Sequence, residues 1–263
     1  MEPNLIAGGY DAVYAAVPNS PTLRRIWHDL AEGAGFPEEF GHISFTTVPE
    51  LERMASELRL NPGDTLVDLG CGMAGPALWM ARETGAHLIG VDASRVATEQ
   101  AAARAEELGL GEQARFVVGS YADTGIEAGS ADGAMSEDAL QYAPDKEAAM
   151  AEVARILRPG GRFVFTAYEL DPERAAGLPI LGDNIVEDFR PALEKAGFAI
   201  TTYEEVPGWP EPMTATYSAV VEAKDALTQE MGEAATNVLL LEMALTLEHK
   251  PYQRRVLAAA TRE

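Results

Sequence analysis

The chain has 263 residues, and its 20 Lys and Arg residues against 42 Asp and Glu residues give a formal net charge of −22 at pH 7. This length allows one large α/β domain or two small ones. The negative charge disfavours nucleic acid and anionic membrane surfaces as partners. We expect a reduced, cytoplasmic protein, because Cys71 is the single cysteine and neither a signal-peptide pattern nor an apolar run of about 20 residues occurs.

Residues 1–60 predict N-terminal helices, the last of which begins with a capping box formed by Thr47 and Glu50. Beyond them, short apolar runs alternate with helical patterns, and Ser94 and Asp145 stand where helices begin. This alternation predicts parallel strands with right-handed crossovers. The first five strands are expected at residues 65–69, 87–91, 115–118, 133–136 and 162–167.

The last hundred residues predict a helix at 188–195, strands at 198–205 and 254–259, and between these strands two helical stretches at 214–232 and 234–249. The fold class is therefore α/β, with a doubly wound, seven-stranded, mostly parallel sheet. We divide the chain into an N-terminal helical cap (1–60), an α/β core (61–206 and 250–263) and a helical insertion (207–249). The insertion is either a lid over the carboxyl edge of the sheet or an element for packing or dimerisation.

A glycine-rich loop follows the first strand, with Gly70, Gly72 and Gly75 spaced as in dinucleotide-binding proteins. Asp92, twenty residues after Gly72, suits a ribose in a dinucleotide or in another nucleoside. Asp68, however, places a carboxylate just before the loop, where it opposes a phosphate and suits an ammonium or sulfonium group. The loop therefore favours a positively charged nucleoside over a dinucleotide.

Four ordered segments within residues 60–170 extend this reading: VDLGCGMAG at 67–75, LIGVDAS at 88–94, RFVVGS at 115–120 and LRPGGRFV at 157–164. Together they resemble the motifs of class I S-adenosylmethionine-dependent methyltransferases, of the small-molecule type found in quinone and natural-product biosynthesis. The resemblance implies a Rossmann-like methyltransferase fold, with S-adenosylmethionine as cofactor and S-adenosylhomocysteine as product.

Carried over by position, the resemblance implies a cofactor site formed by Asp68, Gly70, Cys71, Gly72, Asp92, Ala93, Ser120, Tyr121, Ser136 and Glu137. Asp92 is expected to accept hydrogen bonds from both ribose hydroxyls. Ser120 stands where many relatives have an acid that binds the adenine amino group, so this contact should be weaker. The backbone of Ser136 and Glu137 is expected to pass beside the transferable methyl group.

The chemistry depends chiefly on alignment of the acceptor with the methyl group, but an alcohol or phenol acceptor also benefits from a base. Related enzymes often place a histidine just after the fourth strand, where this chain has Gln141 and Tyr142, neither of them a good base at neutral pH. Of the four histidines, we expect His42 to lie near the cofactor. The catalytic candidates are therefore His42, Gln141 and Tyr142.

Other residues near these motifs have open roles. Glu137 and Asp138 could orient an amine or hold a divalent ion, but no metal is assigned. Six aromatic residues could line an acceptor pocket or pack in the core: Tyr10, Tyr14, Trp27, Tyr142, Tyr168 and Trp209.

The predicted function is methyl transfer from S-adenosylmethionine to oxygen, nitrogen or carbon of a small organic acceptor, with a secondary metabolite favoured. One alternative is a protein of this fold that binds the cofactor without transferring methyl, such as a cyclase or a regulator. The other alternative is a nicotinamide-dependent dehydrogenase, which Asp68 and the turn at 159–161 disfavour. We expect a monomer or homodimer that binds a small molecule, with neither nucleic acid nor membrane as partner.

Overall fold

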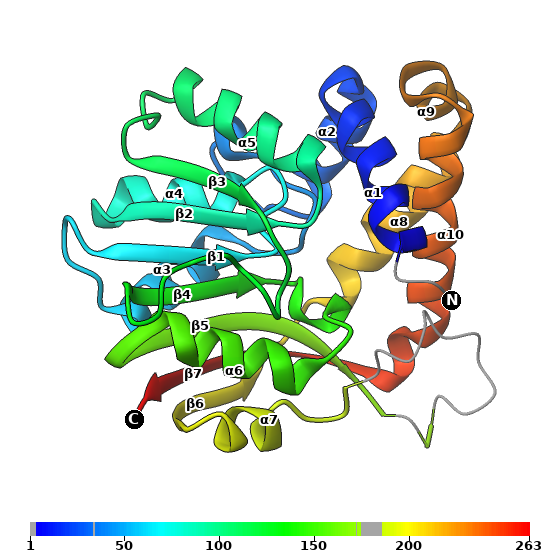
Figure 1. The fold of residues 1–263 in the computed structure, drawn as a ribbon. Helices are drawn as coiled ribbons and strands as arrows, with labels where there is room; N and C mark the ends of the chain where they lie inside the picture. Colours follow the sequence, from blue (N-terminus) through cyan, green and yellow to red (C-terminus); the bar gives the residue numbers. More distant parts are fainter. Residues whose placement is uncertain (1–3, 34, 172, 175–185) are drawn as a thin grey trace.

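One seven-stranded sheet forms the centre of the fold in a computed structural model that describes residues 4–33, 35–171, 173–174 and 186–263 (Figure 1). The order of the strands across the sheet is β3-β2-β1-β4-β5-β7-β6. The strands are β1 (Thr65–Leu69), β2 (His87–Asp92), β3 (Ala114–Val118), β4 (Ala131–Glu137), β5 (Leu157–Leu170), β6 (Phe198–Glu205) and β7 (Gln253–Arg262).

The pairing of the strands confirms the predicted doubly wound, mostly parallel sheet. β1 pairs in parallel with β2 and β4, β2 with β3, and β4 with β5, whereas β7 is antiparallel to both β5 and β6. The chain order reverses between β1 and β4. In sheets of this kind the crevice outside the carboxyl ends at such a reversal is where ligands bind.

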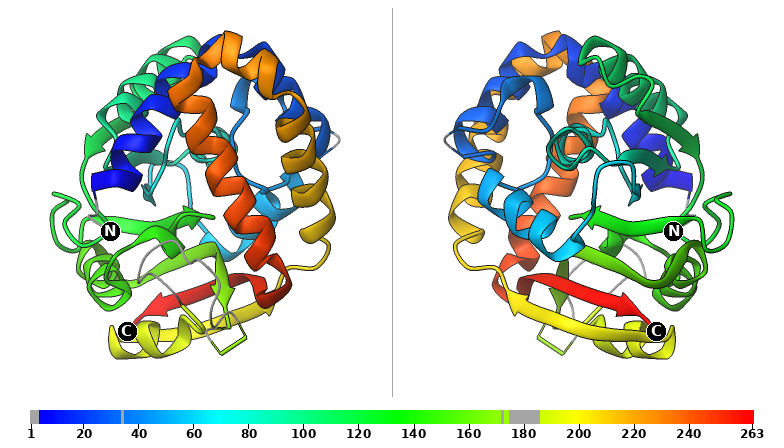
Figure 2. Two further views of the ribbon diagram at one scale, coloured as in Figure 1. Left: turned by 90° about the vertical axis from the view of Figure 1, so that its right-hand side faces the viewer. Right: turned by 90° about the vertical axis from the view of Figure 1, so that its left-hand side faces the viewer.

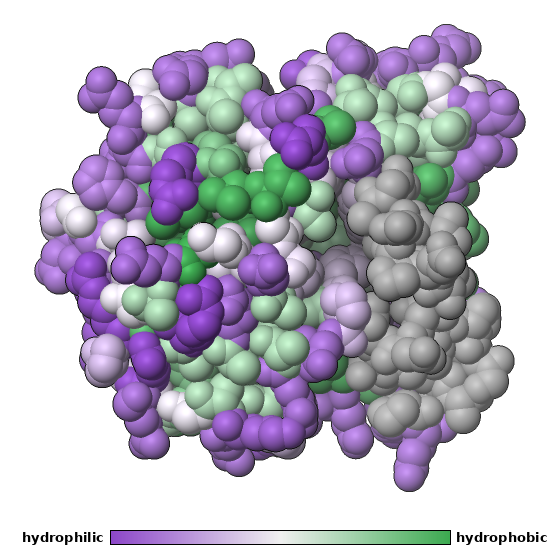
Figure 3. Space-filling model, viewed as in Figure 1, coloured by the Kyte–Doolittle hydropathy of each residue, from purple (hydrophilic) through white to green (hydrophobic). Residues whose placement is uncertain are grey.

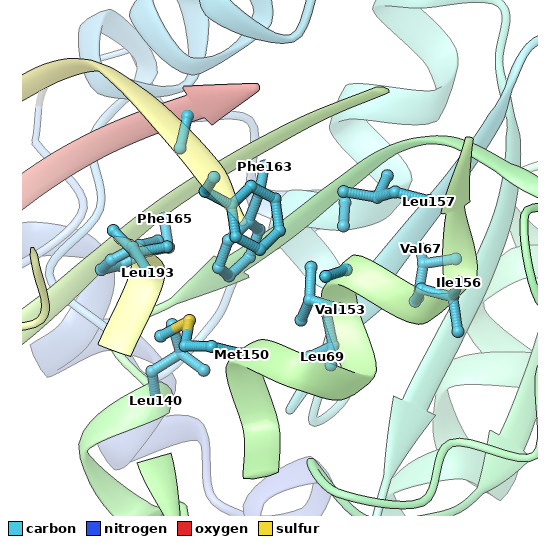
Figure 4. Close-up of a cluster of buried hydrophobic side chains, with 14 of the residues drawn as sticks. Val67, Leu69, Leu140, Met150, Val153, Ile156, Leu157, Phe163, Phe165 and Leu193 are labelled. Carbon is cyan, nitrogen blue, oxygen red and sulfur yellow. The ribbon is translucent and has the colours of Figure 1, made fainter. Parts of the chain in front are cut away.

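Two layers of helices cover the sheet, and the alternation of side chains along each strand sends neighbouring residues to opposite layers. Leu66 packs in the cluster on the side of α3 (Val48–Leu58), α4 (Gly75–Thr84) and α5 (Arg95–Glu107). Val67 packs in the other cluster, with α6 (Lys146–Ile156) and α7 (Arg190–Lys195), as Figure 4 shows. Both faces of β1 are therefore buried, which explains its largely apolar sequence, with Asp68 as the exception near its carboxyl end.

Local capping signals act as predicted. The Ser94 hydroxyl accepts a hydrogen bond from Ala97 N, and the Asp145 carboxylate accepts one from Ala148 N. Thr47 and Glu50 form the capping box at the start of α3. These caps fix where α5, α6 and α3 begin, and α5 and α6 each follow a strand of the sheet at a short distance.

Five helices lie across the carboxyl edge of the sheet and form what we call the helical lobe (Figure 2). They are α1 (Asn4–Ala16), α2 (Pro21–Leu30), α8 (Pro210–Glu222), α9 (Lys224–Met231) and α10 (Glu233–His249). One hydrophobic cluster joins them and includes Val13, Trp27 and Leu239. Glu230 on α9 also accepts hydrogen bonds from the hydroxyls of Ser20 and Thr22 at the start of α2. Helices from the two ends of the chain thus pack as one layer.

The insertion differs in detail from the sequence prediction. The stretch expected as one helix at 214–232 is two helices, α8 and α9, which meet at Ala223. α8 begins at Pro210, because Pro210 and Pro212 fall in its first turn, where a backbone N–H is not needed. In addition, Leu51 and Met54 of α3 pack in the core cluster against the sheet, so packing groups α3 with the core. The three-part division of the chain stays a prediction.

The remaining elements are short 3₁₀ helices in connections: η1 (Val17–Asn19), η2 (Glu38–Phe40), η3 (Leu140–Tyr142) and η4 (Lys250–Tyr252). The surface in Figure 3 is largely hydrophilic, with an apolar patch near the carboxyl end of β3, where Val118 is exposed. None of the described helices is long and apolar enough to cross a membrane.

Candidate functional site

The loop after β1 exposes bare backbone at the reversal point of the sheet. Gly70 and Gly72 adopt φ values of +76° and +51°, a region that side chains rarely adopt. A Cβ added at Gly70 would lie 2.5 Å from the Tyr121 hydroxyl, and one at Gly72 would lie 3.0 Å from the Tyr14 hydroxyl. We call this loop the glycine cradle, and a side chain at either position would collide with a tyrosine hydroxyl.

Asp92, at the end of β2, is bound to this cradle. Its Oδ2 accepts a hydrogen bond from Gly72 N at 2.8 Å, and its Oδ1 accepts one from Ser94 N at 2.8 Å. Burial raises the pKa of Asp92, and the two backbone donors oppose that shift. Each carboxylate oxygen can accept a further bond, so Asp92 can bind the two hydroxyls of a ribose.

Asp68 and Glu137 end β1 and β4 with unsatisfied carboxyl groups. Asp68 Oδ1 and Glu137 Oε1 are buried and have no hydrogen-bond partner among the described residues. Burial, and then the charge of Asp92, raise the pKa of Asp68 to about 8. Burial and the neighbouring charge of Asp68 also raise the pKa of Glu137 well above its usual value. Two buried acids without a cation are an arrangement that a positively charged ligand would stabilise.

Other predicted cofactor residues have mixed environments. Ser136 is buried, and its hydroxyl donates to Leu69 O at 2.7 Å, so its side chain joins β4 to β1. The buried Cys71 thiol contacts Gly72 O, whereas Ala93 is exposed beside Asp92. These three residues lie next to the cradle, and their roles stay predictions.

Ser120 and Tyr121, after β3, face different ways. Ser120 is exposed, and its hydroxyl accepts a hydrogen bond from Asp123 N at 3.1 Å within a local turn. The Tyr121 hydroxyl donates to Ala139 O at 2.9 Å and covers Gly70. Tyr121 is therefore the residue of this pair that the structure brings to the cradle.

His42 lies in a buried cluster of the N-terminal segment. Its Nδ1 accepts a hydrogen bond from Ser44 N at 3.1 Å, its ring packs 4.7 Å from that of Phe36, and Glu32 binds its backbone N–H. Burial lowers the pKa of His42 to about 4, so the ring is neutral at pH 7 with its proton on Nε2. Nε2 is then a donor, and neither nitrogen has a lone pair free to act as a base. The catalytic role predicted for His42 gains no support from this geometry.

Gln141 and Tyr142 form part of η3, directly after β4. Gln141 Nε2 donates to Asp138 O, and the Tyr142 hydroxyl donates to Glu242 Oε1 at 2.8 Å. Gln141 therefore stabilises the loop, whereas Tyr142 points toward α10 of the helical lobe. No group of three potential metal ligands occurs among the residues that the structure describes.

Asp138 and Arg255 form a buried ion pair that sequence reasoning missed. Asp138 has a φ of +48°, which is uncommon for a residue with a side chain, and its Oδ1 accepts from Arg255 Nε at 2.7 Å. Arg255, 1% exposed, also donates to Glu50 and to the Thr46 hydroxyl. The one available signal was an arginine directly before the apolar run of the last strand.

Comparison with known proteins identifies the family to which this chain belongs. The model of the methyltransferase domain family matches residues 67–165. The chain is 30% identical over 193 residues to the methyltransferase GfsG of Streptomyces halstedii, covering 69% of this chain and 68% of that protein. It is 25% identical to the 27-O-demethylrifamycin SV methyltransferase of Amycolatopsis mediterranei, covering 80% of this chain and 79% of that one.

Longer relatives and solved structures extend the comparison. The chain is 28% identical to a sterol 24-C-methyltransferase of Gibberella zeae, of which it spans 56%. A geranyl diphosphate methyltransferase in complex with S-adenosylmethionine superimposes with a TM-score of 0.62 at 25% identity, covering 82% of this chain and 85% of that one. The [4+2]-cyclase SpnF superimposes with a TM-score of 0.75 at 22% identity over 100% of this chain and 97% of that one, which shows a shared fold.

The cradle at Gly70 and Gly72 and the unpaired acids Asp68 and Glu137 fit a nucleoside with a sulfonium and an ammonium group. The sequence relatives and the matching domain agree with this fit and disagree with a dinucleotide. S-adenosylmethionine is the cofactor, and this chain belongs to the class I S-adenosylmethionine-dependent methyltransferases.

Proposed function

We propose that this chain transfers the methyl group of S-adenosylmethionine to a small and largely apolar acceptor of secondary metabolism that carries no negative charge. The observation that carries the proposal is the gathering of Asp68, Asp92 and Glu137 around the glycine cradle at the carboxyl edge. When bound, the cofactor supplies an electrophilic methyl group on a positively charged sulfur. Asp68 and Glu137 have no cationic partner among the described residues, so the positive charge of the cofactor can balance them.

Within this proposal each residue has a separate task. Asp92 accepts hydrogen bonds from the ribose hydroxyls while it holds Gly72 N, and Asp68 and Glu137 face the positive charges of the methionine part. Tyr121 covers Gly70 and excludes water from the loop. The residues bind and orient, which is the main requirement of an in-line displacement.

The acceptor side is aromatic. Tyr168 packs against Trp209 with ring centroids 5.2 Å apart, and Phe45 packs against Tyr217 at 5.5 Å. Arg255 lies 6.0 Å from the Tyr168 ring, but Asp138 and Glu50 already bind it. Arg255 is therefore not available to neutralise a phosphate, which favours an acceptor unlike geranyl diphosphate. The similarity to the 27-O-demethylrifamycin SV methyltransferase supports the same choice.

Calorimetric titration tests the cofactor site. We expect S-adenosylhomocysteine to bind and NADH not to bind, and the reverse result would overturn the proposal. Gly70→Ala should weaken S-adenosylhomocysteine binding at least tenfold, since its Cβ would lie 2.5 Å from the Tyr121 hydroxyl. Gly160→Ala is the matched control, because Gly160 has a similar φ of +81° and open space around it.

Methyl transfer is tested by incubation of the protein with S-adenosylmethionine and a panel of phenols, amines and polyketide-like alcohols. Formation of S-adenosylhomocysteine with at least one acceptor is the expected result. A protein that binds the cofactor but forms no product with any acceptor would agree with the cyclase or regulatory alternative. The proposal includes three further expectations: a monomer or homodimer, a cytoplasmic location, and no affinity for nucleic acid, since the net charge of −22 opposes such binding.

A further inference from the structure

A glutamate of the helical lobe is held by two tyrosines from distant parts of the chain. The Tyr10 hydroxyl on α1 donates to Glu242 Oε1 at 2.5 Å, and the Tyr142 hydroxyl on η3 donates to the same oxygen at 2.8 Å. Glu242 Oε2 has no hydrogen-bond partner among the described residues. Two donors therefore fix the carboxyl group while one of its oxygens remains available.

Glu242 is half-buried and lacks the arginine partner that two buried glutamates of this chain have. Arg162 binds Glu57 at 2.8 Å, Arg155 binds Glu152 at 2.6 Å, and no described Lys or Arg pairs with Glu242. Burial raises the pKa of Glu242, and the two tyrosine hydrogen bonds oppose the shift. An acid among aromatic side chains without a cationic partner destabilises the fold, which points to a role in binding a ligand.

The position of Glu242 joins the acceptor side to the cofactor cradle. The ring of Tyr10 lies 5.7 Å from that of Tyr14, whose hydroxyl is 3.0 Å from the point where a Cβ of Gly72 would stand. The Tyr10 ring also lies 6.1 Å from that of Tyr142, which follows the β4 loop. Glu242 thus reaches the same edge of the sheet as the cofactor, from the opposite side.

We propose that Glu242 Oε2 accepts a hydrogen bond from a hydroxyl or protonated amine of the acceptor, with Tyr10 and Tyr142 holding the carboxylate in place. This inference rests on the proposed function, because it assigns the polar end of the same acceptor site. If it is correct, the site selects molecules that carry an N–H or O–H group. A carboxylate oxygen can only accept hydrogen bonds. The site therefore rejects ligands that have no N–H or O–H donor or that carry a negative charge, since these leave the carboxylate unpaired.

Four bicyclic probes of one shape test the selection by titration into the protein loaded with S-adenosylhomocysteine. They are 2-naphthol, 2-naphthylmethylamine, 2-acetylnaphthalene and 2-naphthoate. We expect 2-naphthol or the amine to bind at least tenfold more tightly than the ketone and the carboxylate. Whichever of these two probes binds more tightly shows whether the methyl acceptor offers a hydroxyl or an ammonium group.

Variants attribute the selection to one residue. Glu242→Gln should reduce the preference to less than threefold, whereas Glu248→Gln, on the exposed side of the same helix, should leave it unchanged. Unaltered affinity for S-adenosylhomocysteine shows that a variant is folded and that the cofactor site is intact, so failure of the proposed function is seen separately. If Glu242→Gln does not fold, Tyr10→Phe should lower the affinity for the favoured donor probe at least threefold.

Four results would overturn the inference. They are a wild-type protein that binds neither donor probe, a ketone or carboxylate that binds as tightly as the donors, a preference that survives in Glu242→Gln, and an unchanged affinity in Tyr10→Phe. A preference for the ketone in particular would show that the carboxyl group is protonated and donates.

Discussion

Two groups of acids lie near the carboxyl edge of the sheet, and only one of them has a cationic partner. Asp138 and Glu50 share the buried Arg255, and the loop that carries Asp138 keeps an unusual backbone conformation. Asp68 and Glu137, at the ends of β1 and β4, have buried oxygens without partners. The first group is complete within the chain, whereas we propose that the cationic part of the cofactor completes the second. A carboxylate left unpaired in a fold that pairs others nearby marks where a cation binds.

Removal of the cation from the complete group should have the largest effect. Arg255→Met leaves Asp138 and Glu50 without their partner, and we expect the free energy of unfolding to fall by about 3–5 kcal/mol, since a buried charge is left uncompensated. Unfolding in urea, followed by circular dichroism, measures this loss.

Arg190→Met is the matched control for this experiment. Arg190 pairs with Asp188 at 2.7 Å, but its side chain is half exposed, so its loss should destabilise the fold far less than the loss of Arg255. Equal effects of the two substitutions would show that the pairing of Arg255 is not what separates the two groups.

Asp92 is intermediate between the two groups in how its charge is stabilised, because backbone N–H groups bind it and no arginine does among the described residues. Asp92→Asn keeps the shape but turns an amide NH₂ toward Gly72 N or Ser94 N and leaves one acceptor fewer for the ribose. We expect the affinity for S-adenosylhomocysteine to fall by about 1–3 kcal/mol. Calorimetry measures this loss, and an affinity within a factor of two of the wild-type value would exclude Asp92 from the ribose site.

The contrast between these groups also shows what the sequence could predict. The positions of the strands, the caps at Ser94 and Asp145 and the glycine-rich loop depend on residues close together in the chain, and periodicity or spacing reveals them. Glu242 meets Tyr10 across 232 residues, and Arg255 meets Glu50 across 205. Such contacts depend on how elements that are far apart in the sequence pack together, which no local pattern encodes.

His42 shows the same limit in another form. Its place just before a capped helix predicts a position near the cofactor. Whether its ring can act as a base depends on burial and on the hydrogen bond from Ser44 N, which the sequence does not show. The helix break at Ala223 was likewise invisible, since no glycine or proline stands there. Tertiary packing decided both.

The pH dependence of cofactor binding tests the unpaired group directly. Because the pKa of Asp68 is raised to about 8, the folded protein without ligand holds a proton there that the unfolded chain releases above pH 4. Its free energy of unfolding should therefore fall as the pH rises from about 4 to about 8. Binding of a cation favours the ionised form, so the affinity for S-adenosylmethionine should rise with pH, at most about tenfold per pH unit, and level off above pH 8.

Asp68→Asn is the variant that isolates this effect. Calorimetry from pH 6 to pH 9 should show a flatter dependence for the variant, with the remaining slope due to Glu137, whose pKa is also raised. S-adenosylhomocysteine, which lacks the positive sulfur, should show a weaker dependence than S-adenosylmethionine. The same slope in wild type and variant would mean that Asp68 does not face the cation.

His42 should give the smallest effect, because it is buried but neutral. In His42→Asn the amide oxygen can accept the hydrogen bond from Ser44 N in place of Nδ1, so we expect the free energy of unfolding at pH 7 to change by less than about 1 kcal/mol. The pKa of His42 is lowered to about 4, and the unfolded chain therefore binds a proton that the folded protein does not between pH 6.5 and 4. Wild type should lose stability faster than the variant as the pH falls through this window, which urea unfolding at pH 7 and pH 5 measures. A variant whose turnover falls about a hundredfold at unchanged cofactor affinity would instead identify His42 as the base, since general-base catalysis contributes effects of that size.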